Sequence, residues 1–528
     1  MAPATPPTAI FLAPAYDHGE YLSGESLGLR SVAAALDRAG VPVNVVDECR
    51  VPLGTGLSER LATALLVGIG VQFTRQIPDA EELAREIRSR WSRPHITVGG
   101  QGSSFLWERI LHHCDAIDSV CAFESDVTVV ELWSRLAGGG DLSSVTGIFH
   151  RARGRIRFHG FREPVEDLDL LPLPHRPPDT SHADHHATIS SSRGCAAHCS
   201  YCQSGNYGNR YHRAARWRCR SPRRVVEELV FLVNEFDVSA VSFVDDDFLG
   251  GDARGRRRAF EIARLLRGAD VGLSFSIECR ADEVEPDVLG ELKRAGLRRV
   301  LIGVESGNAS DIALYGKGLV PGRVRTALRV LRDLELDFSV GFIMFHPEST
   351  PTEVSTNIDF LRENGLGTHR SVTNRLEMYP GSPLVRYFER RGIRFHEESF
   401  RLYYEFKDPT VSIAHRLMKE LLAPFTELER QIDDLRFAEI TRRTVGSRPP
   451  VHLENIAAMT SDALLDSARM CLEFARSSTE DESRLANDLN TGIESVRYSL
   501  RKELGEHTNT TFTDRPFPRS VRYRGGAP

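Results

Sequence analysis

Long apolar runs are missing from this chain of 528 residues, and no window approaches the roughly 18 apolar residues that a membrane-spanning helix needs. The first residues, MAPATPPTAIFLAPAYD, lack the basic start and long apolar stretch of a signal peptide. The net charge is −6, so the composition carries no basic footprint for nucleic acid or an anionic membrane. We therefore expect a cytoplasmic protein with neither nucleic acid nor a membrane as partner.

Cysteine is limited to nine residues, an odd and mostly scattered number that argues against a disulfide framework. Three of them, Cys195, Cys199 and Cys202, nevertheless cluster in SSRGCAAHCSYCQSGNYGNR (191–210). In a reducing compartment, clustered thiols indicate metal or redox chemistry. Spacing alone leaves zinc open, with His198 or Cys219 as a fourth ligand, and leaves an iron–sulfur cluster equally open.

The length exceeds what one hydrophobic core usually serves, so we expect two or three domains. Between residues 8 and 136, short apolar runs alternate with helical patterns, which is typical of a parallel, doubly wound sheet. Such sheets bind ligands beyond the carboxyl ends of their strands. The expected strands are 9–14, 41–47, 64–73, 95–100 and 117–123, and the expected helices are 27–40 and 79–91.

A proline-dense stretch at 149–185 predicts a linker between this first domain, 1–148, and a second alternating series at 186–395. Six strand–helix units in that series suit a barrel-like parallel sheet, whose chemistry lies at the carboxyl ends of the strands. Residues 396–507 have helical periodicity and no strand pattern, and we expect 508–528 to be a disordered tail. The expected strands of the second series are 187–193, 240–246, 272–278, 299–305, 338–345 and 372–378.

The cysteine motif C-x3-C-x2-C, with Tyr201 before the last cysteine and a strand before the loop, resembles the radical S-adenosylmethionine (SAM) superfamily. The resemblance implies a [4Fe–4S] cluster held by Cys195, Cys199 and Cys202, with SAM bound at the fourth iron and cleaved to a 5′-deoxyadenosyl radical. Neither His198 nor Cys219 is then needed as a ligand. The zinc alternative and the structural alternative, in which each later motif is a helix cap or surface pair, stay open on the residues alone.

Later strand ends carry further motifs of that family: SFVDDDFLGG (242–251), FSIECRAD (275–282) and LIGVESGN (301–308). A fourth, GFIMFHPESTPTEV (341–354), departs from the family's usual GxPGE and reads His346-Pro347-Glu348. Asp247 is a further candidate in the first of these motifs. The residues that the resemblance assigns to SAM are Tyr201, Asp245, Asp246, Glu278, Arg280, Glu305 and Ser306.

The first domain resembles the cobalamin-binding domain that precedes the barrel in one radical SAM class, through residues 28–47, GIGVQFT (68–74), VGGQGSS (98–104) and DSVCAFESDVTVVEL (118–132). The histidine-supplying DxHxxG signature is absent, and Ala122 to Ser125 replace the usual GEGE. The resemblance implies cobalamin contacts at Gln72, Phe73, Thr74, Gly99, Gly100, Gln101 and Glu124. A domain that serves only as a scaffold is the alternative.

The whole chain is thus expected to be α/β: an N-terminal doubly wound, Rossmann-like domain of cobalamin-binding type, a central partial (β/α)6 TIM-like barrel and a C-terminal α-helical region. The resemblance implies a C-methyltransferase that acts on a natural-product (antibiotic) intermediate and uses a [4Fe–4S] cluster, SAM and cobalamin. Its partners would be a small-molecule substrate, which a carrier protein could present, and a reductant such as flavodoxin or ferredoxin. A radical dehydratase, cyclase or rearrangement enzyme is the alternative, and a non-catalytic iron–sulfur carrier or sensor is the remote one.

Overall fold

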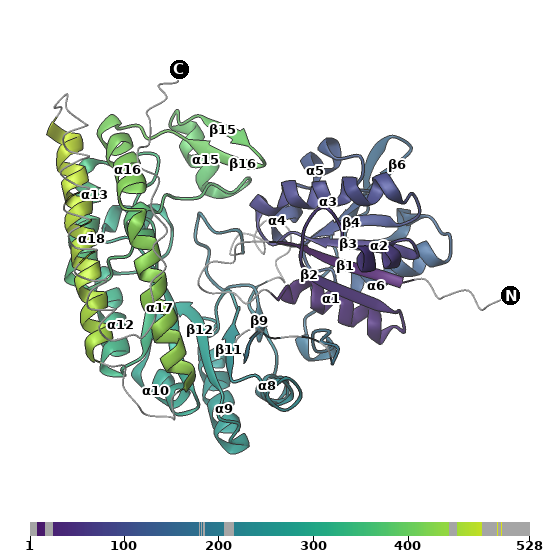
Figure 1. Cartoon of the computed structure of the whole chain (residues 1–528), viewed down its shortest axis with the longest axis horizontal. Helices are drawn as coiled ribbons and strands as arrows, with labels where there is room; N and C mark the ends of the chain where they lie inside the picture. Colours follow the sequence, from purple (N-terminus) through teal and green to yellow (C-terminus); the bar gives the residue numbers. More distant parts are fainter. Residues whose placement is uncertain are drawn as a thin grey trace.

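The computed structural model describes residues 8–15, 25–178, 180, 182, 185–204, 216–442 and 451–477, together with 491, 494 and 498. The chain forms two lobes, an N-terminal sheet domain and a larger central domain to which the C-terminal helices belong (Figure 1). The expected tail at 508–528 lies outside the described residues. Among the helices of the described part, none is both long enough and apolar enough to cross a bilayer.

The N-terminal sheet has seven strands in the order β2-β1-β3-β4-β5-β6-β7, and the first five run parallel. Both faces are buried because strand residues alternate: Ile10 and Leu12 pack on one side of the sheet, and Ala9 and Phe11 on the other. This confirms the doubly wound arrangement. The five parallel strands are β1 Thr8–Pro14, β2 Val43–Cys49, β3 Ala64–Gly70, β4 His95–Gly99 and β5 Ser119–Cys121; the helices are α1 Leu27–Arg38, α2 Thr55–Leu61, α3 Ile77–Arg90, α4 Gln101–Ser104, α5 Trp107–His113 and α6 Asp126–Ala137.

The expected linker at 149–185 begins too early. Ile148–Ala152 forms β6 and Arg155–Phe158 forms β7, an antiparallel hairpin on the edge of the N-terminal sheet. The hairpin was missed because prolines later in the segment dominated its composition. Farther along, the buried Arg176 side chain pairs with Glu25 at 2.7 Å and with Glu228 at 3.0 Å, so this stretch packs against both lobes.

The central domain is built on a five-stranded, all-parallel sheet in the order β14-β13-β12-β11-β8. The sixth expected strand, at 372–378, is reduced to isolated bridges such as Phe345 to Arg375. The strands are β8 His186–Ile189, β11 Ala240–Phe243, β12 Ser274–Arg280, β13 Leu297–Glu305 and β14 Asp337–Phe342; the helices are α8 Pro222–Phe236, α9 Ala253–Ala269, α10 Pro286–Arg294, α11 Ala309–Leu314, α12 Pro321–Asp333, α13 Pro351–Glu363, α14 His369–Thr373 and α15 Pro383–Arg390. Proline near the first helical position, where its missing N–H costs nothing, starts α8, α10, α12, α13 and α15.

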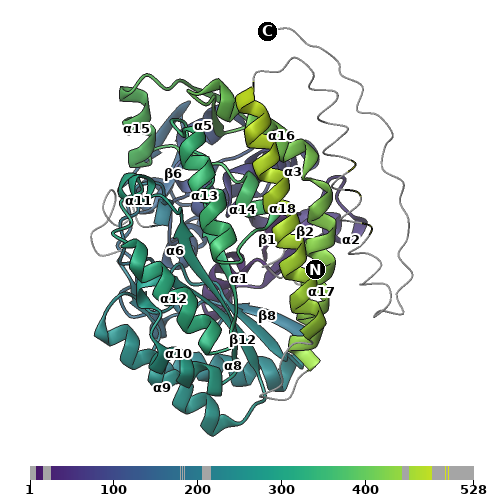
Figure 2. The same ribbon diagram turned by 90° about the vertical axis from the view of Figure 1, so that its left-hand side faces the viewer.

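The C-terminal region is helical from Pro409 but begins with a hairpin that the sequence pattern did not predict, β15 (Phe395–Glu398) and β16 (Arg401–Tyr404). At its tip Phe400 is buried in the core of the N-terminal domain, 5.5 Å from the His113 ring. The helices α16 (Pro409–Leu421), α17 (Pro424–Arg442) and α18 (Val451–Ser477) lie on the opposite side, where α18 packs on α13 and α16. In Figure 2, which views the molecule from that side, the N-terminal domain lies behind them.

Candidate functional site

The three clustered cysteines lie on the loop that follows β8 and the short strand β9 (Ser192–Arg193). Cys199 is buried, Cys195 and Cys202 are half-buried, and all nine cysteines of the chain are free thiols. The loop is anchored in its middle, where the Ser200 N–H donates to the Tyr315 carbonyl and the Ser200 hydroxyl donates to the Leu314 carbonyl, both at 2.8 Å. Three thiols are therefore presented from one braced loop at a strand end.

Their spacing bears on the zinc alternative. Ligand sulfurs about 2.3 Å from a tetrahedral zinc lie about 3.8 Å from one another. Within the described residues, one set of three ligand-type side chains has its ligand atoms within 4.8 Å of one another, and it contains no cysteine. The thiols with His198 or Cys219 thus do not form a compact zinc site, whereas a [4Fe–4S] cube holds its thiolates farther apart on separate irons.

Tyr201, on the cysteine loop, contacts Glu305 at the end of β13. Glu305 ends β13 with a left-handed backbone (φ 70°), a conformation that costs a non-glycine residue about 1–3 kcal/mol and clusters at functional sites. Its buried carboxylate pairs with Lys317, and burial together with Glu305 raises the pKa of the Tyr201 hydroxyl. Gly303 leaves room for this pair, because a Cβ there would lie 2.2 Å from the Lys317 Nζ. The sequence analysis missed Lys317; its position in Gly-Lys-Gly, after a helix that follows the GVESGN motif, was the available clue.

The aspartates after β11 have three different environments. Asp245 is buried and accepts from the Ser191 hydroxyl at 3.0 Å and from the Ser192 hydroxyl at 2.6 Å, so it braces the strand that leads into the cysteine loop. Asp246 is exposed, and its carboxylate accepts a hydrogen bond from Ser204. Asp246 is therefore the member of this run that is open to a ligand.

Asp247 is fully buried and lies against Cys195, whose Sγ is 3.8 Å from the Asp247 Oδ2. Burial and this carboxylate raise the pKa of the Cys195 thiol to about 12. Burial and the Asp247 carboxylate also raise the pKa of Glu283. Glu283 is a second residue that sequence reasoning missed. A thiol in such surroundings is held as a thiolate only when a metal supplies the compensating positive charge.

Glu278 and Arg280, on β12, approach the same place. Arg280 donates to the Lys317 carbonyl at 2.8 Å and to the Cys199 Sγ at 3.9 Å. Glu278 is half-buried, and burial with the charges of Asp246 and Asp245 raises its pKa to about 7. The carboxyl ends of β11, β12 and β13 thus bring cations and carboxylates together around the cysteine loop, which suits a ligand with one ammonium and one carboxylate group.

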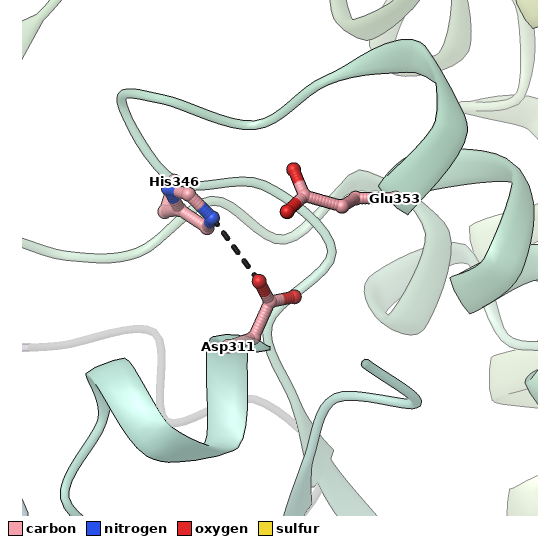
Figure 3. A group of neighbouring side chains, drawn as sticks. All are labelled: Asp311, His346 and Glu353. Atoms are coloured by element: carbon pink, nitrogen blue, oxygen red, sulfur yellow. Dashed lines mark hydrogen bonds and ion pairs between the residues drawn. The ribbon is translucent and has the colours of Figure 1, made fainter. Parts of the chain in front are cut away.

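Ser306, the remaining SAM candidate, bonds to Asp311, which lies in a separate cluster with His346 and Glu353. Figure 3 shows that cluster. The Ser306 hydroxyl donates to the Asp311 Oδ2 at 2.6 Å, and the His346 Nε2 lies 3.3 Å from the other Asp311 oxygen. The His346 Nδ1 accepts from the Glu348 N–H, so the ring proton resides on Nε2 and points at Asp311. A metal-ligating nitrogen carries no proton. Ser306, Asp311 and His346 therefore form a hydrogen-bonded brace in which His346 acts as a donor, and the Glu353 carboxylate lies next to it.

The cobalamin candidates lie at the carboxyl edge of the N-terminal sheet. Gln72 is exposed, Phe73 is half-buried beneath the Arg75 guanidinium at 5.2 Å, and Thr74 is buried. The N–H groups of Gln72 and Phe73 donate to the Gln76 side chain at 2.9 and 3.0 Å, so this turn is satisfied internally. These side chains stand on the edge where a doubly wound sheet binds ligands.

The Gly99–Gly100–Gln101 turn follows β4 on the same edge. Gly100 has φ 112°, and a Cβ there would lie 2.4 Å from the Val71 carbonyl oxygen, so close backbone packing already requires this glycine. Gln101 is exposed, and its Nε2 donates to the Ser204 hydroxyl at 2.8 Å, two residues beyond Cys202. The edge of the N-terminal sheet therefore touches the cysteine loop directly.

Glu124, the last cobalamin candidate, has its carboxylate bound by arginines of the central domain. It accepts from Arg193 at 3.1 Å and from Arg218 at 3.2 Å, and it pairs with Arg218 through its other oxygen as well. Its side chain is held between the lobes by these two arginines. Arg193 and Arg218 were both missed by sequence reasoning, since the pattern of the chain does not show which surface faces the second lobe.

Two family descriptions match the chain: the B12 binding domain over residues 21–133 and the radical SAM superfamily over residues 189–361. An uncharacterized methyltransferase of Pyrococcus horikoshii is 26% identical over 381 residues, covering 69% of this chain and 78% of that protein. An anaerobic magnesium-protoporphyrin IX monomethyl ester cyclase of Synechocystis is 27% identical over 318 residues, covering 58% of this chain and 62% of the cyclase. The chain therefore spans less than two thirds of the cyclase.

The fold is also that of a solved structure, the cobalamin-dependent S-adenosylmethionine radical enzyme OxsB with aqua-cobalamin bound. The TM-score is 0.73 at 18% identity, over 96% of this chain and 81% of OxsB. The two matched domains fix the cofactors as a [4Fe–4S] cluster, SAM and cobalamin, and the free, braced thiols and the open carboxyl edge fit them. The chain thus carries a radical SAM domain with a B12-binding domain ahead of it.

Proposed function

We propose that this chain is a cobalamin-dependent radical SAM methyltransferase that acts on a small-molecule substrate. One observation carries the proposal: the carboxyl edge of the B12-binding domain bonds directly to the cysteine loop, through Gln101 and Ser204 at 2.8 Å. The two cofactor-binding edges therefore face each other. The Pyrococcus relative is named a methyltransferase, which supports the same assignment.

In this proposal Cys195, Cys199 and Cys202 hold three irons of the cluster, and the fourth iron is left for SAM. Asp246 and Glu278 accept from the SAM ammonium group, and Arg280 and Lys317 offer the positive charge that its carboxylate needs. Glu305 pairs with Lys317 and Tyr201 bonds to Glu305, so these two residues position the Lys317 ammonium group. Ser306 keeps its hydrogen bond to Asp311. The charges present and their positions around the loop support these roles.

On the facing edge, we propose that Gln72, Phe73, Thr74 and the Gly99–Gln101 turn line the corrin. When the cofactors are bound, the cluster supplies the electron that cleaves SAM and cobalamin carries the methyl group. The protein orients the two and excludes water between the lobes. A reduced flavodoxin or ferredoxin supplies the electron, and the substrate is a natural-product intermediate, free or presented on a carrier protein.

The test is a product analysis of anaerobically reconstituted, reduced full-length protein incubated with SAM, with and without hydroxocobalamin. We expect 5′-deoxyadenosine in both samples, because it requires the cluster alone. We expect S-adenosylhomocysteine, the product of methyl donation from SAM, in the cobalamin sample alone. Absence of 5′-deoxyadenosine under both conditions contradicts radical chemistry, and absence of S-adenosylhomocysteine with cobalamin contradicts methyl transfer.

The similarity to the Synechocystis cyclase favours a second candidate, a radical cyclase or rearrangement enzyme without methyl transfer. It predicts 5′-deoxyadenosine in both samples and S-adenosylhomocysteine in neither. The same experiment therefore separates the two candidates. The methyltransferase is preferred because the Pyrococcus relative is matched over 78% of its length and the cyclase over 62%.

A further inference from the structure

The base of the cysteine loop is closed by a short antiparallel ribbon. Its strands are β9 (Ser192–Arg193) and β10 (Arg218–Cys219), and Arg193 lies opposite Arg218 in the register. Directly opposed residues of an antiparallel pair project from the same face. The two guanidinium groups therefore project from the same face of the ribbon, and Arg193 is two residues before Cys195.

Both arginines bind the loop after β5 in the other lobe. Arg193 forms a two-pronged contact with Asp126, its Nη1 and Nη2 donating to separate carboxylate oxygens at 2.7 and 3.0 Å, and it also donates to Glu124 at 3.1 Å. Arg218 donates to both oxygens of Glu124 and to the Val165 carbonyl at 2.7 Å. We call these four charged residues, Arg193, Arg218, Glu124 and Asp126, the interlobe clamp.

The clamp is electrically balanced, with Asp126 and Arg218 buried and Arg193 and Glu124 half-buried. Asp126 is 4% exposed and Arg218 is also 4% exposed, so water does not compete for their contacts. Burial opposes ionisation of Asp126, but the Arg193 guanidinium outweighs it and lowers the pKa of that carboxyl. Two guanidinium groups face two carboxylates, in the planar geometry that makes arginine–carboxylate pairs directional.

The carboxylate side of the clamp stands on a constrained backbone. Phe123, next to Glu124, has φ 60°, and its N–H donates to the Ser104 hydroxyl oxygen at 2.7 Å. Asp126 is the first residue of α6, where the helix N-terminus favours a negative charge. A displacement of β5 or α6 is therefore passed to the ribbon rather than absorbed in the loop.

We propose that the interlobe clamp consists of positioning residues that set the separation between the cobalamin on the N-terminal sheet and the cluster on the cysteine loop. The inference rests on the proposed function, because the separation affects the reaction only if a methyl group passes between the two cofactors. Reacting atoms must approach to about 3–3.5 Å, and a misplacement of about 1 Å costs about 100-fold in rate. Cleavage of SAM at the cluster needs no such alignment with the corrin.

The test uses full-length protein loaded with cluster and cobalamin, in the wild type and in the variants Asp126→Asn, Glu124→Gln and Arg218→Lys. These changes keep side-chain shape or charge and remove the two-pronged contacts. The matched control is Glu131→Gln, which removes a carboxylate from the same helix α6 whose partner, Arg162, does not reach the cysteine loop. The first readout is the magnetic dipolar coupling between the reduced cluster and cob(II)alamin, which reports their distance without turnover.

We expect a longer or broader cluster-to-cobalt distance in the clamp variants and the wild-type distance in the control. The second readout is product formation from SAM: S-adenosylhomocysteine falls about 100-fold in the clamp variants, while 5′-deoxyadenosine stays within about threefold. Unchanged distances and products in Glu124→Gln and Arg218→Lys overturn the proposal, and so does an equal effect in Glu131→Gln. If the wild type makes no S-adenosylhomocysteine, the proposed function fails, and the distance measurement still decides whether the clamp positions the cofactors.

Discussion

Glu278 offers a prediction whose size follows from the structure. Burial and the nearby Asp246 and Asp245 raise its pKa from 4.5 to about 7. The folded state therefore binds the Glu278 proton more tightly than the unfolded state does, and folding stability falls as the pH rises from about 4.5 to about 7. Each pKa unit corresponds to about 1.4 kcal/mol, so ionised Glu278 costs the folded state at most about 3 kcal/mol above pH 7.

Replacing Glu278 by Gln removes this titration and keeps the size of the side chain. We expect Glu278→Gln to gain up to about 3 kcal/mol relative to the wild type between pH 4.5 and pH 8. For a domain of this size that gain is an increase of about 6–12 °C in the melting temperature of the central domain. The assay is thermal unfolding of the full-length protein without cofactors at both pH values. Equal pH dependence in the two proteins would refute the electrostatic reasoning.

Three further predictions concern single residues. Replacing Cys199 by Ala removes the iron and the brownish absorbance of the reconstituted protein, whereas Cys219→Ala, on the ribbon, retains both; equal iron in the two variants would contradict the ligand assignment. Lys317→Met leaves the buried Glu305 carboxylate without its cation and lowers the free energy of unfolding by about 3–5 kcal/mol, and adding Glu305→Gln recovers part of the loss in denaturant titrations. Gly100→Ala, with φ 112° and a Cβ 2.4 Å from the Val71 oxygen, lowers the stability of the N-terminal domain by about 1–3 kcal/mol, whereas Gly56→Ala in α2, with open space around it, raises it by up to about 1 kcal/mol; a neutral Gly100→Ala would show that the turn relaxes freely.

The sequence predicted the two parallel sheets well, because strands buried on both faces leave continuous apolar runs. The runs at 9–14 and 299–305 fall on β1 and β13 within two residues at each end. Weakly patterned segments were less predictable. The hairpin of β6 and β7 was hidden beside prolines, and residues 372–378 form isolated bridges because α14 occupies the start of that segment.

The site was partly predictable for a similar reason. Motif residues such as Asp246, Glu278 and Arg280 lie at strand ends, and parallel strands bring their ends together, so the chain itself indicated their proximity. Lys317 and Arg193 could not be found this way. Their partners, Glu305 and Asp126, lie 12 and 67 residues away, and the pairing depends on how loops and lobes pack in three dimensions.

The central claim is that the braced cysteine loop holds a cluster with one iron open to SAM. The most direct test is electron–nuclear double resonance on the reduced cluster, with SAM labelled by ¹⁵N in its amino group. We expect a hyperfine coupling from the labelled nitrogen that shows direct bonding to iron. A reduced [4Fe–4S] cluster that shows no such coupling with SAM bound would contradict the account.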